Sequence, residues 1–118
     1  MSAGVEDLYV EQGTGFVVSF SYRQPDGTTP VNVANWVAKM EICTGYRIPP
    51  VLTVGTATGE IVVDGTNGKF TLSLTATQTD LLGDDGAPYI YDILLTPPGQ
   101  QPIRLVEGSV SVSLAVTT

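Results

Sequence analysis

The chain has 118 residues, 42% of them hydrophobic and 14% charged, and a formal net charge of −7. Chains of this length bury a core without metals or disulfides, and this composition excludes intrinsic disorder. The 12 acidic residues outnumber the 5 basic ones, which excludes nucleic acid and anionic membranes as partners, and no apolar run approaches the ~20 residues of a membrane-spanning helix.

The chain contains a single cysteine, Cys43, so no disulfide can form within it. A domain held together by its core alone fits folding in a reducing cytoplasm. The N-terminus has neither the basic region nor the apolar run of a signal peptide. We therefore expect one domain, spanning residues 1–118, that is made in the cytoplasm.

Alternating apolar and polar residues in the first half of the chain predict strands with one buried face. Within residues 14–22, Phe16, Val18 and Phe20 fall on one side and are expected to face the core. Trp36 opens another alternating stretch and is also expected to face the core. The extended segments predicted in this half are residues 6–11, 14–22, 31–35, 36–43, 51–56 and 60–64.

The alternation is strongest in the second half, where strands are predicted at residues 69–75, 89–96 and 103–116. The Asn-Gly pair at residues 67–68 predicts a hairpin turn before the first of them. The alternation breaks at residues 77–82, so we expect one helical turn there, with Leu81 and Leu82 tucked under the sheets. Gly108 interrupts the last strand and is expected to mark a β-bulge.

This pattern of short strands between turn residues, without a helical stripe, is typical of an all-β fold. Strands that recur every 8–12 residues or so indicate a sandwich or a barrel. With Trp36 in a middle strand, we predict an immunoglobulin-like β-sandwich of about 7–9 antiparallel strands. The pair of cysteines found in antibody domains is absent, so an antibody-type domain is not implied.

The sequence offers little for catalysis. It has no histidine, no Gly-x-Ser-x-Gly motif and no phosphate-binding loop, so we expect no enzyme and no cofactor. Asp80, Asp84 and Asp85 form an acidic group for which a weak calcium site and a solvated loop are the alternatives. Their spacing does not match the twelve-residue calcium loop, which favours the solvated loop and no metal.

Cys43 also has two interpretations: a reactive or intermolecularly bonded thiol, and an inert thiol at the end of a strand. The basic residues near it in sequence are Lys39 and Arg47. Because a reactive cysteine needs a positive neighbourhood that the sequence does not establish, we favour the inert thiol.

Two segments are candidate partner contacts. Tyr46, Arg47 and Ile48 combine aromatic, arginine and aliphatic side chains, the composition of interface anchors. Tyr9 lies in an acidic first strand with Glu6 and Asp7. That strand is either a docking edge for a basic partner or an edge protected by charge from unwanted pairing.

The remaining tyrosines are candidates for a carbohydrate-binding face. Tyr22, Tyr89 and Tyr91 fall at core-facing positions of the predicted strands, where the ring is buried and the hydroxyl lies at the rim. This leaves few exposed aromatic residues for a glycan to stack on.

The order of elements resembles a known group of proteins. An acidic-aromatic segment at residues 6–14 is followed by a Pro-Asp-Gly turn and by Pro30-Val31-Asn32, which leads into Trp36. In the second half, Tyr89-Ile90-Tyr91-Asp92 is followed by Pro97-Pro98-Gly99 and then by residues 104–110. It is similar to small immunoglobulin-like structural domains of tailed bacteriophages, including those at the N-terminus of upper baseplate proteins. Those baseplate proteins carry further domains after this module. Because the sequence ends at Thr118, we expect a small accessory subunit rather than a receptor-binding platform.

This resemblance implies a non-enzymatic virion subunit: a capsid decoration, tail or baseplate accessory protein. Its partners would be other virion proteins in a symmetric assembly of many copies, with the protein made in the host cytoplasm and located in the virion. The alternative is a carbohydrate- or surface-binding β-sandwich module. A third hypothesis, a metal-dependent enzyme using Asp80, Asp84 and Asp85, lacks a base and a fourth ligand.

Overall fold

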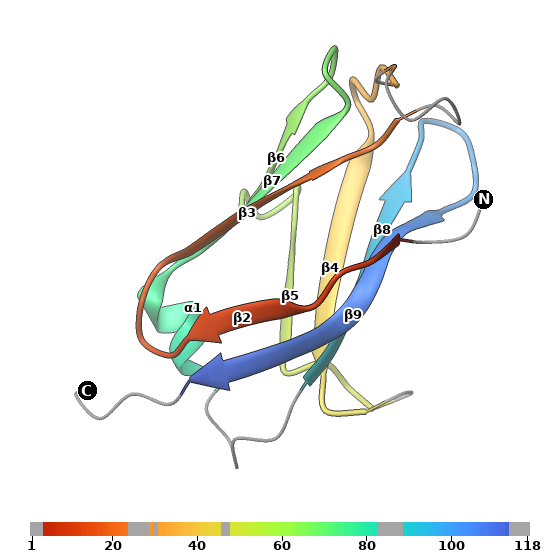
Figure 1. Cartoon of the computed structure of the whole chain (residues 1–118). Helices are drawn as coiled ribbons and strands as arrows, with labels where there is room; N and C mark the ends of the chain where they lie inside the picture. The colour runs from red at the N-terminus through yellow and green to blue at the C-terminus, as the bar shows by residue number, and fades with distance from the viewer. Residues whose placement is uncertain (1–3, 24–28, 30, 46–47, 83–88, 114–118) are drawn as a thin grey trace.

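Two β-sheets pack face to face in the computed structural model, with a short helix at one end (Figure 1). The structure describes residues 4–23, 29, 31–45, 48–82 and 89–113. The larger sheet has the strand order β1-β9-β8-β4-β5, with β2 also paired to β9, and the smaller has the order β3-β7-β6. In Figure 1 the red β2 and the blue β9 run side by side along the front of the larger sheet.

The bounds of the strands follow the predicted alternation closely. The larger sheet consists of β1 (Gly4–Val5), β2 (Leu8–Glu11), β4 (Val37–Cys43), β5 (Leu52–Gly55), β8 (Tyr89–Thr96) and β9 (Ile103–Ser113). The smaller sheet consists of β3 (Phe16–Ser21), β6 (Ile61–Asp64) and β7 (Lys69–Leu74). The predicted end of the last strand beyond residue 113 lies outside the described residues.

The strand order is that of an immunoglobulin-like sandwich, so this predicted fold is confirmed. Such folds place the second, fifth and fourth strands in one sheet and the third, sixth and seventh in the other. Here β3-β7-β6 and β4-β8-β9 hold those places, and β5 extends the second sheet. Tyr89 opens β8 and is 1% exposed, at a position where many of these sandwiches bury a tyrosine.

The expectation of wholly antiparallel pairing needs a correction at the N-terminus. Both β1 and β2 pair with β9 in parallel, with Leu8 opposite Val110 and Glu11 opposite Ser113. The chain crosses to the other sheet after β2, turning at Gly13 with φ at 79°. Because β2 therefore forms no hairpin with the next strand, it is free to run alongside β9 in the same direction.

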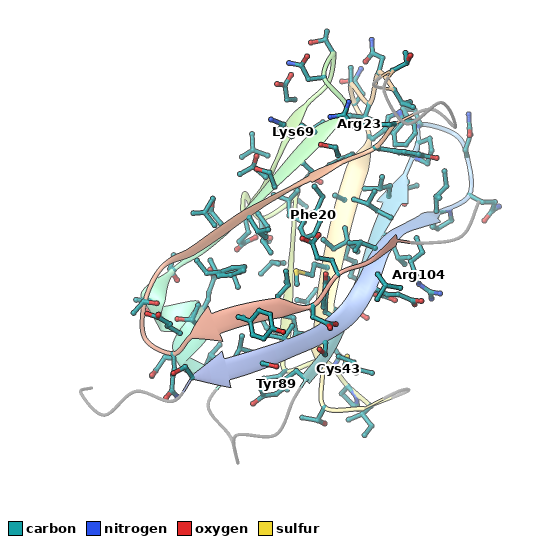
Figure 2. The ribbon with its side chains drawn as sticks, viewed as in Figure 1. Phe20, Arg23, Cys43, Lys69, Tyr89 and Arg104 are labelled. Atoms are coloured by element: carbon teal, nitrogen blue, oxygen red, sulfur yellow. The ribbon has the colours of Figure 1, made fainter. Side chains whose placement is uncertain are left out.

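The core lies between the sheets, as the alternation predicts. Phe20 projects from β3 into this space (Figure 2) and is buried, and so are Ala38, Met40 and Ile42 of β4. Trp36 precedes β4 and is half-buried, packing edge-on against Tyr22 with ring centroids 5.6 Å apart. The residues at every second position after Trp36 along this strand therefore face the core, as predicted, and Trp36 itself lies at the edge of the core.

The predicted hairpin and helical turn are both present. Gly68 closes the β6–β7 turn with φ at 60°, where a Cβ atom would lie 2.6 Å from the Tyr22 carbonyl oxygen. Helix α1 (Ala76–Asp80) begins at Thr75, whose side chain forms a capping box with Gln78. The expectation for the two leucines is half right: Leu82 is buried, but Leu81 is 54% exposed because it follows the helix on the solvent side.

Gly108 does not mark a bulge, contrary to the sequence-based expectation. The register of β9 against β8 shifts at Leu105, since Ile93 pairs with Val106 and Leu94 with Arg104. Gly108 is needed for a different reason: a Cβ atom there would collide with the carbonyl oxygen of Glu6. A glycine within a strand marks either a bulge or a close backbone approach, and here it permits the approach.

The segment that connects β1 to β2 is fixed to the larger sheet at this point. The Tyr91 hydroxyl donates a hydrogen bond to the Glu6 carbonyl oxygen at 2.6 Å, and the Ser109 amide donates to the Asp7 carboxylate at 3.1 Å. Burial, and then the charges of Glu6 and Asp7, raise the pKa of Tyr91 above its ordinary value. The hydroxyl therefore remains a proton donor throughout the usual pH range.

Replacing Gly108 with alanine should lower the free energy of unfolding by about 2 kcal/mol or more, because the methyl group displaces the Glu6 backbone. Gly15→Ala is the matched control, since a Cβ atom there would lie an ordinary 3.8 Å from the Leu74 carbonyl oxygen. Urea unfolding of both variants measures the difference. Equal stability of the two variants would contradict the close approach.

Tyr91→Phe should cost about 1–2 kcal/mol of unfolding free energy, because the Glu6 carbonyl oxygen loses its donor while the ring stays packed. Thermal unfolding gives the loss. Hydrogen exchange should localise it, with faster exchange at the Glu6 amide, which donates to Glu107 at 3.0 Å. A variant with unchanged stability and exchange would show that this hydrogen bond does not hold the segment.

Candidate binding face

The outer face of the larger sheet carries a row of carboxylates that crosses three adjacent strands. Glu41 of β4 lies opposite Asp92 of β8, and Asp92 lies opposite Glu107 of β9. Side chains of neighbouring paired residues lie on the same face of a sheet, so the three carboxylates form one line. Their side chains are 40%, 32% and 48% exposed, respectively.

Two basic side chains lie beside this row. The Arg104 guanidinium approaches Asp92 Oδ2 at 3.3 Å and Glu107 Oε2 at 3.8 Å, and the Lys39 ammonium approaches Glu41 Oε2 at 3.4 Å. Arg104 projects outward from β9 in Figure 2. All of these ion pairs are partly exposed, so each contributes little to stability, and the side chains remain free to exchange partners.

The row and Arg104 together border a hollow of about 530 Å³ that opens to solvent. Apolar groups come to it from four separate parts of the chain: Val5, Cys43, Ile48 and Ile90. Val5 is 77% exposed and Ile48 is 49% exposed. The hollow therefore combines an exposed apolar surface with a charged border, the composition of an interface rather than of a core.

The N-terminal segment forms one wall of this hollow. Val5 of β1 and Gly108 and Ser109 of β9 all line it. Their positions depend on the close approach at Gly108 and on the Asp7–Ser109 hydrogen bond described above. The shape of the hollow is therefore fixed by the same contacts that hold β1 against the larger sheet.

Cys43 lies in the hollow but is a poor nucleophile. Burial, and then the charges of Glu41 and Asp92, raise the pKa of its thiol above the ordinary value. A raised pKa leaves less thiolate at neutral pH, and thiolate is the reactive form. These effects support the inert thiol over the reactive one.

Native Cys43 should therefore react with the disulfide reagent DTNB more slowly than the same cysteine in the denatured chain, at about pH 8. As the pH is raised, the reaction rate of native Cys43 should keep increasing beyond the ordinary thiol pKa, because the pKa of this thiol lies higher. Stopped-flow absorbance of the native and guanidinium-unfolded protein compares them. A native rate equal to or above the unfolded rate would contradict the inert thiol.

The predicted contact residues divide between different roles. Ile48 lines the hollow, whereas Tyr46 and Arg47 lie outside the described residues. The Asp7 carboxylate and the Glu6 carbonyl group are engaged in holding the first strand, so these groups have a structural role.

Tyr9 is 75% exposed and pairs with Ser111 on the outer face, one strand away from the carboxylate row. The predicted tyrosine burial is confirmed: Tyr89 and Tyr91 are buried and Tyr22 is half-buried. Among the described residues, this leaves Tyr9 as the exposed tyrosine, too few for a platform on which sugars stack.

The carboxylate row itself was not among the predicted sites. Glu41, Asp92 and Glu107 are far apart in sequence, and their alignment depends on the register of two strand pairs. The predicted alternation does place all three residues on the polar faces of their strands. However, alternation alone does not predict which residues of the neighbouring strands lie beside them.

No metal site is found among the described residues. No group of three or more acidic or cysteine side chains there lies close enough to hold an ion. Asp80 is exposed at the end of α1, but Asp84 and Asp85 lie outside the described residues. In the same described part of the chain, no helix is long and apolar enough to cross a membrane.

Comparisons with known proteins give structural matches alone. No family model and no curated protein matches the chain. A structure of voltage-gated sodium channel (VGSC) β subunits, studied for cell-adhesive interactions, matches with 11% identity and a TM-score of 0.45, covering 98% of this chain and 96% of that one.

Two further structures match at TM-scores of 0.40. Extracellular domains 3–5 of Drosophila OTK are 16% identical over 96% of this chain, which spans 34% of the OTK chain. A complex of ICOS with ICOS-L and an anti-ICOS-L VNAR domain is 12% identical, covering 96% of this chain and 56% of that one. Matches of this strength carry no argument about function, and the assignment of the fold rests on the strand pairing.

Proposed function

We propose that this protein is a non-enzymatic binding module that docks another protein on the outer face of its larger sheet. The single observation that carries the proposal is the hollow, where exposed Val5 and Ile48 meet the border formed by Glu41, Asp92 and Glu107. An exposed apolar surface next to polar groups is costly to leave in water, and it is the usual composition of a protein contact.

A protein partner is favoured over a carbohydrate by the choice of side chains. Carbohydrate sites depend on exposed aromatic rings, and the hollow is lined by aliphatic groups with Tyr91 buried beneath them. Tyr9 stands apart from the hollow, beside Ser111 near the start of β2. Among the described residues, the hollow therefore offers no pair of rings that would hold a sugar.

The finer form of the proposal is a virion subunit, for which the similarity of element order to phage structural domains remains the support. In that setting the outer face would dock a capsid, tail or baseplate protein, and symmetry would repeat the contact in many copies. The comparisons supply nothing on this point. The alternative, a surface-binding module that is not part of a virion, would use the same face and would bind a different partner.

Photo-crosslinking tests the proposal directly. p-Benzoylphenylalanine in place of Val5 samples the hollow, and the same replacement of Val62 samples the smaller sheet at 63% exposure. The proteins are irradiated in the cells or particles that contain them. We expect a discrete adduct from position 5 and none from position 62, and mass spectrometry of the adduct identifies the partner.

Two results would overturn parts of the proposal. Adducts absent from position 5, or equally strong from position 62, would contradict docking on this face. An adduct with a protein that is not a component of a phage particle would contradict the virion setting while leaving the binding module intact.

A further inference from the structure

We propose that the docked segment of the partner is basic: an arginine or lysine seated on the carboxylate row, with aliphatic neighbours in the hollow. This inference rests on the proposed function and deepens it by specifying the chemistry of the partner. It is carried by the distribution of charge over the two sheets and by the free oxygen atoms of the row.

The two outer faces of the sandwich differ in charge. The strands of the larger sheet carry four acidic residues, Glu11, Glu41, Asp92 and Glu107, against Lys39 and Arg104. The strands of the smaller sheet carry one of each sign, Asp64 and Lys69, which lie opposite one another in adjacent strands. The excess of negative charge among the strands is therefore on the larger sheet, the one that carries the hollow.

The smaller sheet is a poor alternative for docking a charged partner. Its outer face consists of valine, serine and threonine and the opposed pair Asp64 and Lys69, with Ser19 and Thr71 hydrogen-bonded across the strands at 3.1 Å. Val17 and Val62 are exposed there, and neither of them lines the hollow of the larger sheet. This face therefore provides a control surface within the same molecule.

The carboxylate row retains unused acceptor capacity. Arg104 approaches Oδ2 of Asp92 and Oε2 of Glu107, and Lys39 approaches Oε2 of Glu41. The contacting atom is one oxygen of each carboxylate, and the second oxygen takes part in none of these ion pairs. A planar guanidinium from a partner can therefore bridge two of these oxygens, since its donors form a rigid fork.

The apolar half of the hollow specifies what flanks the cation. Val5, Ile48 and Ile90 lie within the same hollow as Glu41 and Glu107. A partner residue next to the arginine or lysine therefore gains by burying an aliphatic side chain against them. Exclusion of water by these contacts also strengthens the ion pair, because screening by solvent falls.

A selection from a random dodecapeptide display library on the full-length protein tests the inference. We expect the enriched peptides to combine arginine or lysine with adjacent aliphatic residues. Synthetic copies should bind roughly tenfold more weakly to Glu41→Gln/Glu107→Gln, the sum of two partly exposed ion pairs. Affinity should also fall between about 0.05 M and 0.5 M NaCl.

The control variant, Asp64→Asn/Asp80→Asn, removes the same amount of charge at exposed positions off this face. It should bind as tightly as the unaltered protein. Thermal unfolding of both double variants verifies that they fold. A third variant, Val5→Arg, obstructs the hollow and should abolish binding of every selected peptide.

Two other outcomes overturn the inference and are distinguishable. The first is that the selected peptides show no enrichment of arginine or lysine but still fail to bind the Val5→Arg variant. This result would refute the basic partner and would still support docking on this face. Peptides that are indifferent to Val5→Arg, or weakened equally by both double variants, would refute both the basic partner and the face.

Discussion

The close approach of the Glu6 backbone to β9 determines how the larger sheet ends and how its outer face is shaped. The approach is permitted by the missing side chain of Gly108 and is held by the Tyr91 hydroxyl on the Glu6 carbonyl oxygen. It reinforces the parallel backbone pairing of β1 and β2 with β9. The wall of the hollow that Val5 contributes depends on the same approach.

The two sheets are held together without a covalent link. Antibody domains join their two sheets by a disulfide between the second and sixth strands. In this chain the corresponding strands, β3 and β8, contribute Phe20 and Tyr91 to the core, and the single cysteine lies on the outer side of β4. Apolar packing holds the sheets together, while Tyr91 additionally anchors the first strands through its hydroxyl.

Much of the fold was predictable because it follows from local chemistry. Period-two alternation located β3, β7 and β8, and Asn67-Gly68 identified the hairpin, since both depend on neighbouring residues alone. Gly108 was misread because a glycine within a strand has two explanations, and the deciding atom belongs to Glu6, far away in sequence. The parallel pairing of β2 escaped prediction for the same reason.

The candidate site was predictable only in part. Ile48 was singled out from composition and lies in the hollow, whereas Glu6 through its carbonyl oxygen and Asp7 through its carboxylate hold the first strands. The register of the strand pairs aligns Glu41, Asp92 and Glu107 in one row. The sequence pattern does not determine the register between strands that are distant in sequence. The carboxylate row and the apolar hollow beside it therefore arise from the way the strands are arranged in the sheet.

The measurement that tests this account most directly is an NMR titration of isotopically labelled protein with a selected basic peptide. The account predicts shift changes at the amides of Val5, Ile90, Glu107 and Ser109, with the amides of β3 and β7 unmoved. Changes confined to the smaller sheet, or spread evenly over both, would contradict the assignment of the binding face.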